Sequence, residues 1–184
     1  MKKIKTALIS VSDKENLKPL LQLLKKYKIK IISSGGTFKK IKNLKFKCTE
    51  ISEFTNSKEI LNGRVKTLHP KIHAGILNKR KNKNHLNDIN KLNYENIDLV
   101  IVNFYPFEKI IKQTKNHDKI IENIDIGGPT MVRAAAKNYN DVVVITSSEY
   151  YKNLIYELNN NKGFTSLEFR KEMSRIAFAD IAYY

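Results

Sequence analysis

The sequence has 184 residues, of which 41% are hydrophobic and 28% charged, and these are ordinary values for one globular domain with its own core. No stretch approaches the roughly 20 apolar residues that a helix needs to span a bilayer, so we expect no membrane partner. Cys48 is the only cysteine, which excludes an internal disulfide and favours a reducing, cytoplasmic compartment.

The net charge is +16, from 34 basic and 18 acidic residues. Such an excess is typical of proteins that bind nucleic acid or another polyanion. Here the excess is mostly lysine, it is spread over every predicted helix face, and the aromatic residues do not alternate with basic ones in a stacking pattern. We therefore expect no nucleic-acid partner, although a positive field would still attract a phosphorylated substrate.

In the first half of the chain, short β-rich runs alternate with helical ones. Ser12 and Asp13 are expected to cap a helix from about Glu15 to Lys26, which carries a stripe of leucines. A short helix is expected after the Gly35-Gly36 turn. The predicted strands, two with continuous apolar runs and a weaker third, are Thr6–Val11, Lys30–Ser33 and Cys48–Ile51.

The second half continues the alternation after a long irregular stretch, residues 53–83, whose length is typical of a functional loop. A glycine pair and Pro129 open a helix that runs to Lys137. Two helices close the chain, and the last has a capping-box pattern at Thr165 and Glu168. The other predicted elements are helices near 85–92 and 118–122 and strands at Asp98–Asn103 and Val142–Ile145.

Strands that alternate with helices predict an α/β fold with a parallel sheet covered on both faces. In such a sheet a ligand lies beyond the carboxyl ends of the strands. The Ser-Gly-Gly-Thr turn at 34–37 could hold a phosphate on its backbone N–H groups, helped by Lys14, or could be a simple turn with an N-cap. The candidate residues that follow the strands are Ser12, Asp13, Lys14, Ser34, Gly35, Gly36, Thr37, Asn103, Tyr105, Asp125, Gly127 and Gly128.

A second candidate segment, residues 63–75, concentrates basic residues and histidines. His69 and His73 have the spacing of a metal pair on a helix, but Pro70 between them and the lack of a nearby carboxylate argue against a metal site. Arg64 offers a planar fork for an anion or a base edge, and Lys66 offers a point charge.

A third candidate segment, residues 124–138, holds Asp125 and Lys137. Asp125 lies between isoleucines and before two glycines, where a partly buried carboxylate could accept a proton or hold a ligand amide. Lys137 ends the helix, where it either complements the helix dipole or, if it turns inward, acts as an acid or base with a lowered pKa. The residues alone leave both roles open.

Together these segments resemble the N-terminal IMP cyclohydrolase domain of the bifunctional enzymes that combine AICAR formyltransferase with IMP cyclohydrolase. The resemblance implies a methylglyoxal-synthase-like three-layer sandwich with a Rossmann-type parallel sheet. It also implies one cyclohydrolase domain over residues 1–184, without the formyltransferase domain, and a homodimer. The segments that carry it, in the family's order, are residues 10–14, 34–37, 63–73, 103–107 and 124–138.

The implied reaction is attack of the carboxamide nitrogen of FAICAR on its own formyl carbon, with loss of water to give IMP and with no cofactor. By resemblance, Lys137 donates and accepts protons and Asp125 activates the carboxamide, while Lys66 and Tyr105 stabilise the formyl oxygen. The residues implied for the phosphate end are Ser12, Asp13, Lys14, Ser34, Gly35, Gly36 and Thr37. Those implied for the nucleoside end are Arg64, Val65, Lys66, Thr67, Val102, Asn103, Asp125 and Ile126.

Three alternatives remain at this point. Methylglyoxal synthase would use the same phosphate turns without needing the segments at 64–73 and 125–137. A regulatory nucleotide-binding module, like the effector domains of carbamoyl phosphate synthetases, would not need Lys66, Tyr105, Asp125 and Lys137 together. A basic nucleic-acid binder would bind random DNA with a steep salt dependence.

Overall fold

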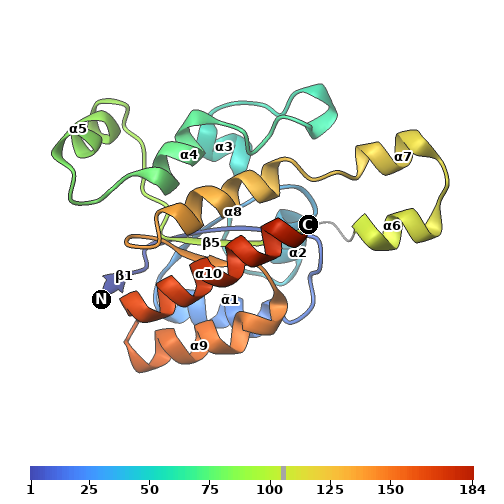
Figure 1. Ribbon diagram of the computed structural model, residues 1–184. Coiled ribbons are helices and arrows are strands. Elements are labelled where there is room, and N and C mark those ends of the chain that lie inside the picture. Colours follow the sequence, from blue (N-terminus) through green and yellow to red (C-terminus); the bar gives the residue numbers. More distant parts are fainter. Residues whose placement is uncertain (105–106) are drawn as a thin grey trace.

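The computed structural model describes residues 1–104 and 107–184, with only the backbone of Lys109 (Figure 1). Its centre is a parallel five-stranded sheet in the order β4-β3-β2-β5-β6. Numbered along the chain, these strands follow the 3-2-1-4-5 order of Rossmann-type sheets, which confirms the predicted fold class. Their bounds are β2 Thr6–Val11, β3 Lys30–Ser33, β4 Thr49–Glu50, β5 Leu99–Asn103 and β6 Val143–Ile145.

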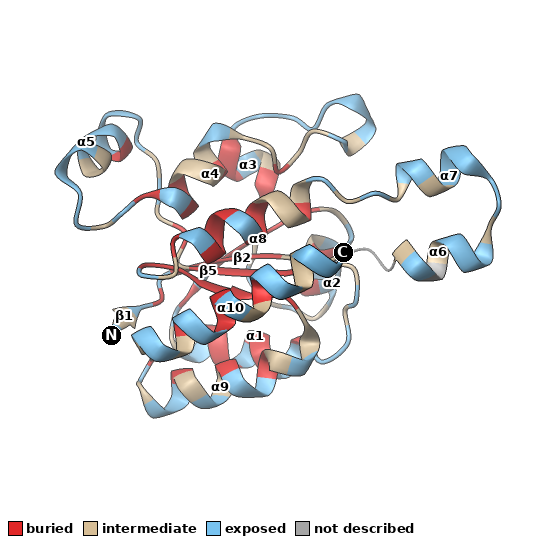
Figure 2. Ribbon diagram, in the orientation of Figure 1, coloured by how far each residue is buried: buried red, intermediate tan, exposed pale blue. Residues whose placement is uncertain are grey.

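The strands are apolar because both faces of the sheet are covered (Figure 2). Alternate residues of β2 point to opposite layers. Ala7 and Ile9 join the cluster with the leucines of α1 (Leu17–Lys26), whereas Leu8 joins the cluster with α4 (Pro70–Leu77) and α8 (Gly127–Lys137). Two separate hydrophobic layers therefore hold the sheet, and they leave its carboxyl edge for other functions.

The helices divide between the two faces and an outer group. Helix α10 lies along α8 and β6 (Figure 1). On one face lie α1 Leu17–Lys26, α2 Gly35–Asn43 and α9 Tyr151–Asn160, and on the other α3 Ile51–Thr55, α4 Pro70–Leu77 and α8 Gly127–Lys137. The rest are α5 Lys83–Lys91, α6 Phe107–Gln113, α7 His117–Glu122 and α10 Leu167–Tyr183. Among the described residues, no helix is both long and apolar enough to cross a membrane.

Shorter elements complete the chain. Two two-residue strands, β1 Lys2–Lys3 near the start of the chain and β7 Phe164–Thr165 before the last helix, form a small antiparallel pair. Single 3₁₀ turns occur at η1 Leu61–Gly63 and η2 Ser148–Tyr150.

The prediction of an irregular stretch over residues 53–83 is wrong in its centre. Helix α4 begins at Pro70, with His69 as its N-cap, and proline is tolerated there because the first N–H groups of a helix have no acceptor. Ile72 and Ile76, four residues apart, are buried against the sheet. Packing of this apolar pair stabilises a helix that is too short to give a clear periodic signal.

The expected cap of the first helix is also wrong. Helix α1 begins at Leu17 after Asn16, which has a left-handed backbone and makes no side-chain cap. Asp13 accepts a hydrogen bond from the N–H of Glu15 (2.8 Å), and Ser12 turns toward the end of β5. The two polar side chains therefore shape the link between β2 and α1.

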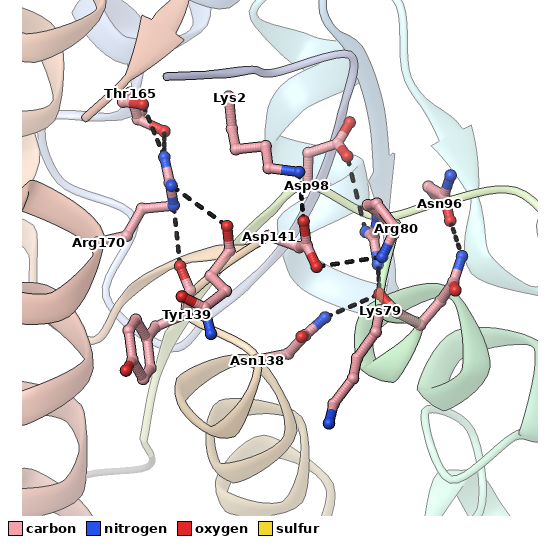
Figure 3. Close-up of polar contacts among 12 residues, drawn as sticks. Lys2, Lys79, Arg80, Asn96, Asp98, Asn138, Tyr139, Asp141, Thr165 and Arg170 are labelled. Carbon is pink, nitrogen blue, oxygen red and sulfur yellow. Dashed lines mark hydrogen bonds and ion pairs between the residues drawn. The ribbon is translucent and has the colours of Figure 1, made fainter. Parts of the chain in front are cut away.

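The last helix is capped one residue later than predicted. Ser166 accepts the N–H of Phe169 (3.2 Å), so Glu168 is not at the third position of a capping box. Thr165 is buried in β7, where its carbonyl (2.6 Å) and hydroxyl (3.1 Å) accept hydrogen bonds from Arg170. Arg170 also donates to the carbonyl of Tyr139 (2.8 Å), and so joins α10 to the turn after α8 (Figure 3).

At the amino ends of the strands, a second polar network holds the loop after α4 (Figure 3). The guanidinium of Arg80 donates to the carbonyl of Ile97 (2.8 Å) and lies 3.6 Å from the carboxylate of Asp98. The backbone N–H of Arg80 donates to the carboxylate of Asp141 (3.1 Å). Lys2 pairs with the other oxygen of Asp141 (2.5 Å). Burial raises the pKa of Asp98 and lowers the pKa of Arg80. We interpret this network as structural, because it lies at the edge of the sheet opposite the carboxyl ends of the strands.

We predict that Arg170→Ala lowers the free energy of unfolding by about 3 kcal/mol, because buried carbonyl oxygens lose their donors. Arg170 is 2% exposed. Urea unfolding followed by circular dichroism measures the change. The matched control is Arg175→Ala on the same helix, whose side chain is exposed and pairs only with Glu172. Equal unfolding midpoints for the two variants would contradict the role given to Arg170.

Candidate active site

The ends of β2 and β5, neighbours at the centre of the sheet, are tied together by Asn103. Its Oδ1 accepts the N–H groups of Ser12 (2.6 Å) and Asp13 (3.1 Å). The hydroxyl of Ser12 lies 2.8 Å from the same oxygen and 2.7 Å from the carbonyl of Phe104. Ser12 and Asn103, both predicted site residues, thus meet at the point where the strand order changes direction, which is where ligands bind in such sheets.

The N-terminus of α2 opens at the end of β3. The first intrahelical bond runs from the N–H of Phe38 to the carbonyl of the N-cap Ser34 (3.2 Å), so the N–H groups of residues 35–37 have no acceptor within the helix. The hydroxyl of Thr37 accepts a hydrogen bond from the N–H of Val11 (3.0 Å) and donates one to the carbonyl of Val11 (2.9 Å). Thr37 can therefore offer a ligand its backbone N–H, whereas its side chain fixes the helix to β2.

Two lysine ammonium groups lie at this helix end. The Nζ of Lys66 is 3.4 Å from the place where a Cβ on Gly35 would stand, and that of Lys14 is 3.7 Å from the corresponding place on Gly36. Gly35 has φ of +53°, which favours glycine. Free N–H groups, the positive end of the helix dipole and two cations are the features that bind a phosphate.

Both basic side chains of the 64–66 segment are paired with carboxylates. Lys66 forms an ion pair with Glu59, and this contact lowers the pKa of Glu59. Arg64 bonds Glu122 of α7 through Nε (3.1 Å) and Nη2. The side chain of Arg64 is therefore directed toward α7. Of these two basic residues, Lys66 is the one that lies with Lys14 at the N-terminus of α2. Neither Glu59 nor Glu122 was predicted from the sequence, because no motif or spacing links either residue to the site.

The N-terminus of α8 carries the candidate carboxylate. Asp125 Oδ1 accepts the N–H of Gly128 (2.8 Å), and a Cβ on Gly128 would stand 2.3 Å from Oδ2. A Cβ on Gly127 would stand 2.3 Å from the hydroxyl oxygen of Thr67. The glycine pair therefore lets Thr67 and Asp125 pack directly on the helix end. Burial raises the pKa of Asp125, and the hydrogen bond from Gly128 opposes that rise.

The other predicted residues lie around this edge in different ways. Tyr105 lies outside the described residues. Asp13 is exposed, and Ile126 is 59% exposed at the start of α8. Val65 is half-buried in the loop before Lys66, whereas the side chain of Val102 is buried in the core and leaves only backbone for a ligand.

Within one chain, Lys137 lies far from the other candidate residues. Helix α8 has 11 residues. At 1.5 Å per residue its last residue is about 15 Å from Gly127. Lys137 is exposed there, at the carbonyl end of the helix, where a cation complements the dipole.

The two histidines of the 63–75 segment lie on α4 but face different partners. The Nδ1 of His69 accepts the N–H of Lys71 (3.1 Å) as the helix cap. His73 hydrogen-bonds the backbone of Thr67, and burial lowers the pKa of its ring. Within the part of the chain that the structure describes, no three His, Cys, Asp or Glu side chains gather as a metal site.

Among the described residues, two of the cavities lie close to the sheet. One of about 320 Å³ adjoins the cluster and is lined by residues 50–52 and 57–59 and by Lys66. The larger, about 640 Å³, lies at the amino ends of β3 and β4, and is lined by five lysines and mainly apolar groups. The smaller cavity adjoins both the predicted site residues and the carboxyl edge, so it is the one that extends the candidate site.

The fold defines a parallel α/β domain, and its carboxyl edge carries free helix N–H groups and lysines of the kind that bind anions. A family model described as the MGS-like domain matches residues 16–130, and one described as the AICARFT/IMPCHase bienzyme matches residues 135–184. The chain belongs to the MGS-like domain family. A solved structure titled "Crystal structure of ForH" is similar, with a TM-score of 0.84, 27% identity, and coverage of 96% of this chain and 92% of the other.

Curated relatives carry the name "Bifunctional purine biosynthesis protein PurH". That of Prochlorococcus marinus strain NATL1A is 51% identical over 97% of this chain, and that of Acetivibrio thermocellus 47% over 98%. That of Bradyrhizobium diazoefficiens is 43% identical over 100% of this chain. The chain spans about a third of the length of these relatives, 34–35%.

We predict that Gly128→Ala lowers the pKa of the Asp125 carboxyl toward its ordinary value, because the added Cβ pushes the carboxylate out to water. In the parent chain the folded-state pKa is raised, so the stability that Asp125 contributes is present below its unfolded pKa and is lost as pH rises through the folded one. An NMR titration of the carboxyl carbon measures both variants. Thr130→Ala, which removes a hydroxyl bonded only to the carbonyl of Ile126 (2.7 Å), is the control and leaves the titration unchanged.

Proposed function

We propose that this chain is an IMP cyclohydrolase, which closes the second purine ring of FAICAR to give IMP and water. The observation that carries the proposal is the meeting of two glycine-lined helix ends at one edge of the sheet. Lys14 and Lys66 lie at the first, and Asp125 lies at the second. The PurH relatives and the bienzyme model support this proposal.

The substrate would span the two helix ends. Its phosphate binds the N–H groups of residues 35–37 and the ammonium of Lys14. The base then extends toward Thr67 and Asp125. Entry of the anion displaces Glu59 from Lys66, which frees this cation for the ligand. The protein's positive charge, +16, favours encounter with such an anion.

Ring closure needs help at two atoms. The carboxamide nitrogen is a poor nucleophile, and the raised pKa of Asp125 suits it to accept the proton that this nitrogen loses. The nitrogen bonds to the formyl carbon, and the formyl oxygen gains negative charge and takes up the proton that the carboxamide nitrogen lost. The formamide nitrogen then loses its own proton and forms the C=N bond of the new ring, while the C–O bond breaks and the oxygen leaves as water. Lys66 stabilises that charge, with Tyr105 assigned the same role by resemblance. Because the reacting groups belong to one molecule, no second substrate or cofactor is required.

Conversion of FAICAR to IMP by the purified chain, followed by absorbance, tests the proposal. We expect turnover by the parent chain and a loss on the order of 10²-fold or more in Lys66→Ala, because oxyanion stabilisation is removed. A folded parent chain without turnover would falsify the assignment. Breakdown of a triose phosphate in its place would assign the chain to methylglyoxal synthesis.

Lys137 stays a proposed acid/base group on resemblance alone. In the same assay we expect Lys137→Ala to lower turnover by on the order of 10²-fold. If the lysine only complements the helix dipole, turnover is retained and thermal stability falls. The thermal unfolding midpoint, measured beside the rate, separates these two roles.

We also propose a cytoplasmic homodimer. Supporting it, four isoleucines on and after the α6–α7 segment are 43–59% exposed: Ile111, Ile121, Ile124 and Ile126. Large apolar side chains that are exposed on one segment are typical of an interaction site. Sedimentation at micromolar concentration is expected to show twice the mass of one chain, and a monomer at all concentrations would contradict the proposal.

A further inference from the structure

The end of α10 reaches the candidate site from a distant part of the sequence. The backbone N–H of Asp125 donates to the hydroxyl oxygen of Tyr184 (3.0 Å). The ring of Tyr184 also contacts that of Phe104, with centroids 4.9 Å apart and planes inclined by 40°. One side chain thus touches the residue after β5 and the candidate carboxylate before α8.

These two contacts lie at the ends of a single excursion of the chain. Between β5 and α8 the chain forms α6 and α7, which stand away from the sheet (Figure 1); Phe104 follows β5, and Asp125 precedes α8. Tyr184 therefore contacts both the point of departure and the point of return. Its ring and its hydroxyl together fix the distance between the sheet edge and the main chain of Asp125.

The end of α10 is itself held in place. Asp180 accepts the hydroxyl of Thr146, which follows β6, and the N–H of Tyr184 bonds the carbonyl of Asp180 (3.0 Å). Earlier in the helix, Ala177 is buried against α8 and the sheet. The phenol consequently has a rigid support and does not depend on a frayed helix end.

We propose that Tyr184 is a positioning residue of this site, which holds Asp125 in the place where its carboxylate meets the substrate carboxamide. The inference rests on the proposed cyclohydrolase function. Two hydrogen bonds then hold Asp125 in position: the N–H of Gly128 donates to its carboxylate, and its own backbone N–H donates to the hydroxyl of Tyr184. A movement of the end of α10 is thereby transmitted to the carboxylate.

Tyr183 provides a matched comparison. It is adjacent in the sequence and is 83% exposed, and its hydroxyl donates to Glu108 of α6 (3.0 Å). Removal of its hydroxyl deletes one tyrosine hydrogen bond, donated to a carboxylate, without touching Asp125. The two single-atom deletions Tyr184→Phe and Tyr183→Phe therefore separate positioning of Asp125 from general support of α10.

The test compares both variants with the parent chain in FAICAR turnover. For Tyr184→Phe we expect kcat to fall about tenfold, the effect of one misplaced hydrogen bond, with KM within about twofold. The acid limb of its pH profile moves to lower pH, because a loosened Asp125 is better hydrated and its raised pKa falls. Tyr183→Phe keeps the parent kcat and pH profile. A purely structural role of Tyr184 would lower the unfolding midpoint and leave the pH profile of the folded enzyme unchanged, and that result overturns the proposal.

A second measurement does not depend on turnover. Amide hydrogen exchange at Asp125 is expected to be at least about tenfold faster in Tyr184→Phe than in the parent chain, and unchanged in Tyr183→Phe. Equal exchange in all three proteins overturns the positioning role. Absence of turnover in the parent chain, with faster exchange in Tyr184→Phe, overturns the proposed reaction while leaving the contact between Tyr184 and Asp125 established.

Discussion

The structure depends on the parallel packing of β2 between β3 and β5. Because every strand of the sheet points the same way, their carboxyl ends meet at one edge, and residues that are distant in the sequence become neighbours there. Asn103, at the end of β5, links these strand ends by accepting hydrogen bonds from the N–H groups of Ser12 and Asp13, which follow β2. The N-termini of α2 and α8 face the same edge, since each helix begins where its chain has left that side of the sheet.

This geometry separates stability from ligand binding. The buried ionic network of Arg80, Asp98 and Asp141 lies at the amino ends of the strands, and the carbonyl contacts of Arg170 hold α10 near the same end. The carboxyl edge instead holds helix N–H groups that have no acceptor within the helix, together with Lys14 and Lys66. Glu59 is paired with Lys66 in the described state, and we propose that the bound substrate takes its place.

Much of this was predictable from local patterns. The strands Thr6–Val11 and Lys30–Ser33 have the predicted bounds, because a continuous apolar run between polar residues is a strong signal for a buried parallel strand. Helix α4 was missed because only two of its residues form the apolar pair that packs on the sheet. The contact of Tyr184 with Asp125 depends on the length and path of α10, which no local pattern encodes.

The position of Lys137 shows a further limit. In a crossover from β5 to β6, helix α8 must run antiparallel to the strands, so only its first turn can reach the carboxyl edge. The sequence placed Asp125 and Lys137 in one segment, but the direction of the helix separates them by its full length. The resemblance assigns Lys137 a chemical role, whereas the fold assigns it a place at the opposite end of α8.

A crystal structure of the chain with IMP tests the central claim most directly. The account predicts the phosphate of IMP on the N–H groups of residues 35–37 beside Lys14, with the pyrimidine ring of the hypoxanthine next to Asp125 and within reach of Lys66. Glu59 is expected to have left Lys66. A phosphate bound elsewhere, such as among the lysines at the amino ends of β3 and β4, would contradict the account.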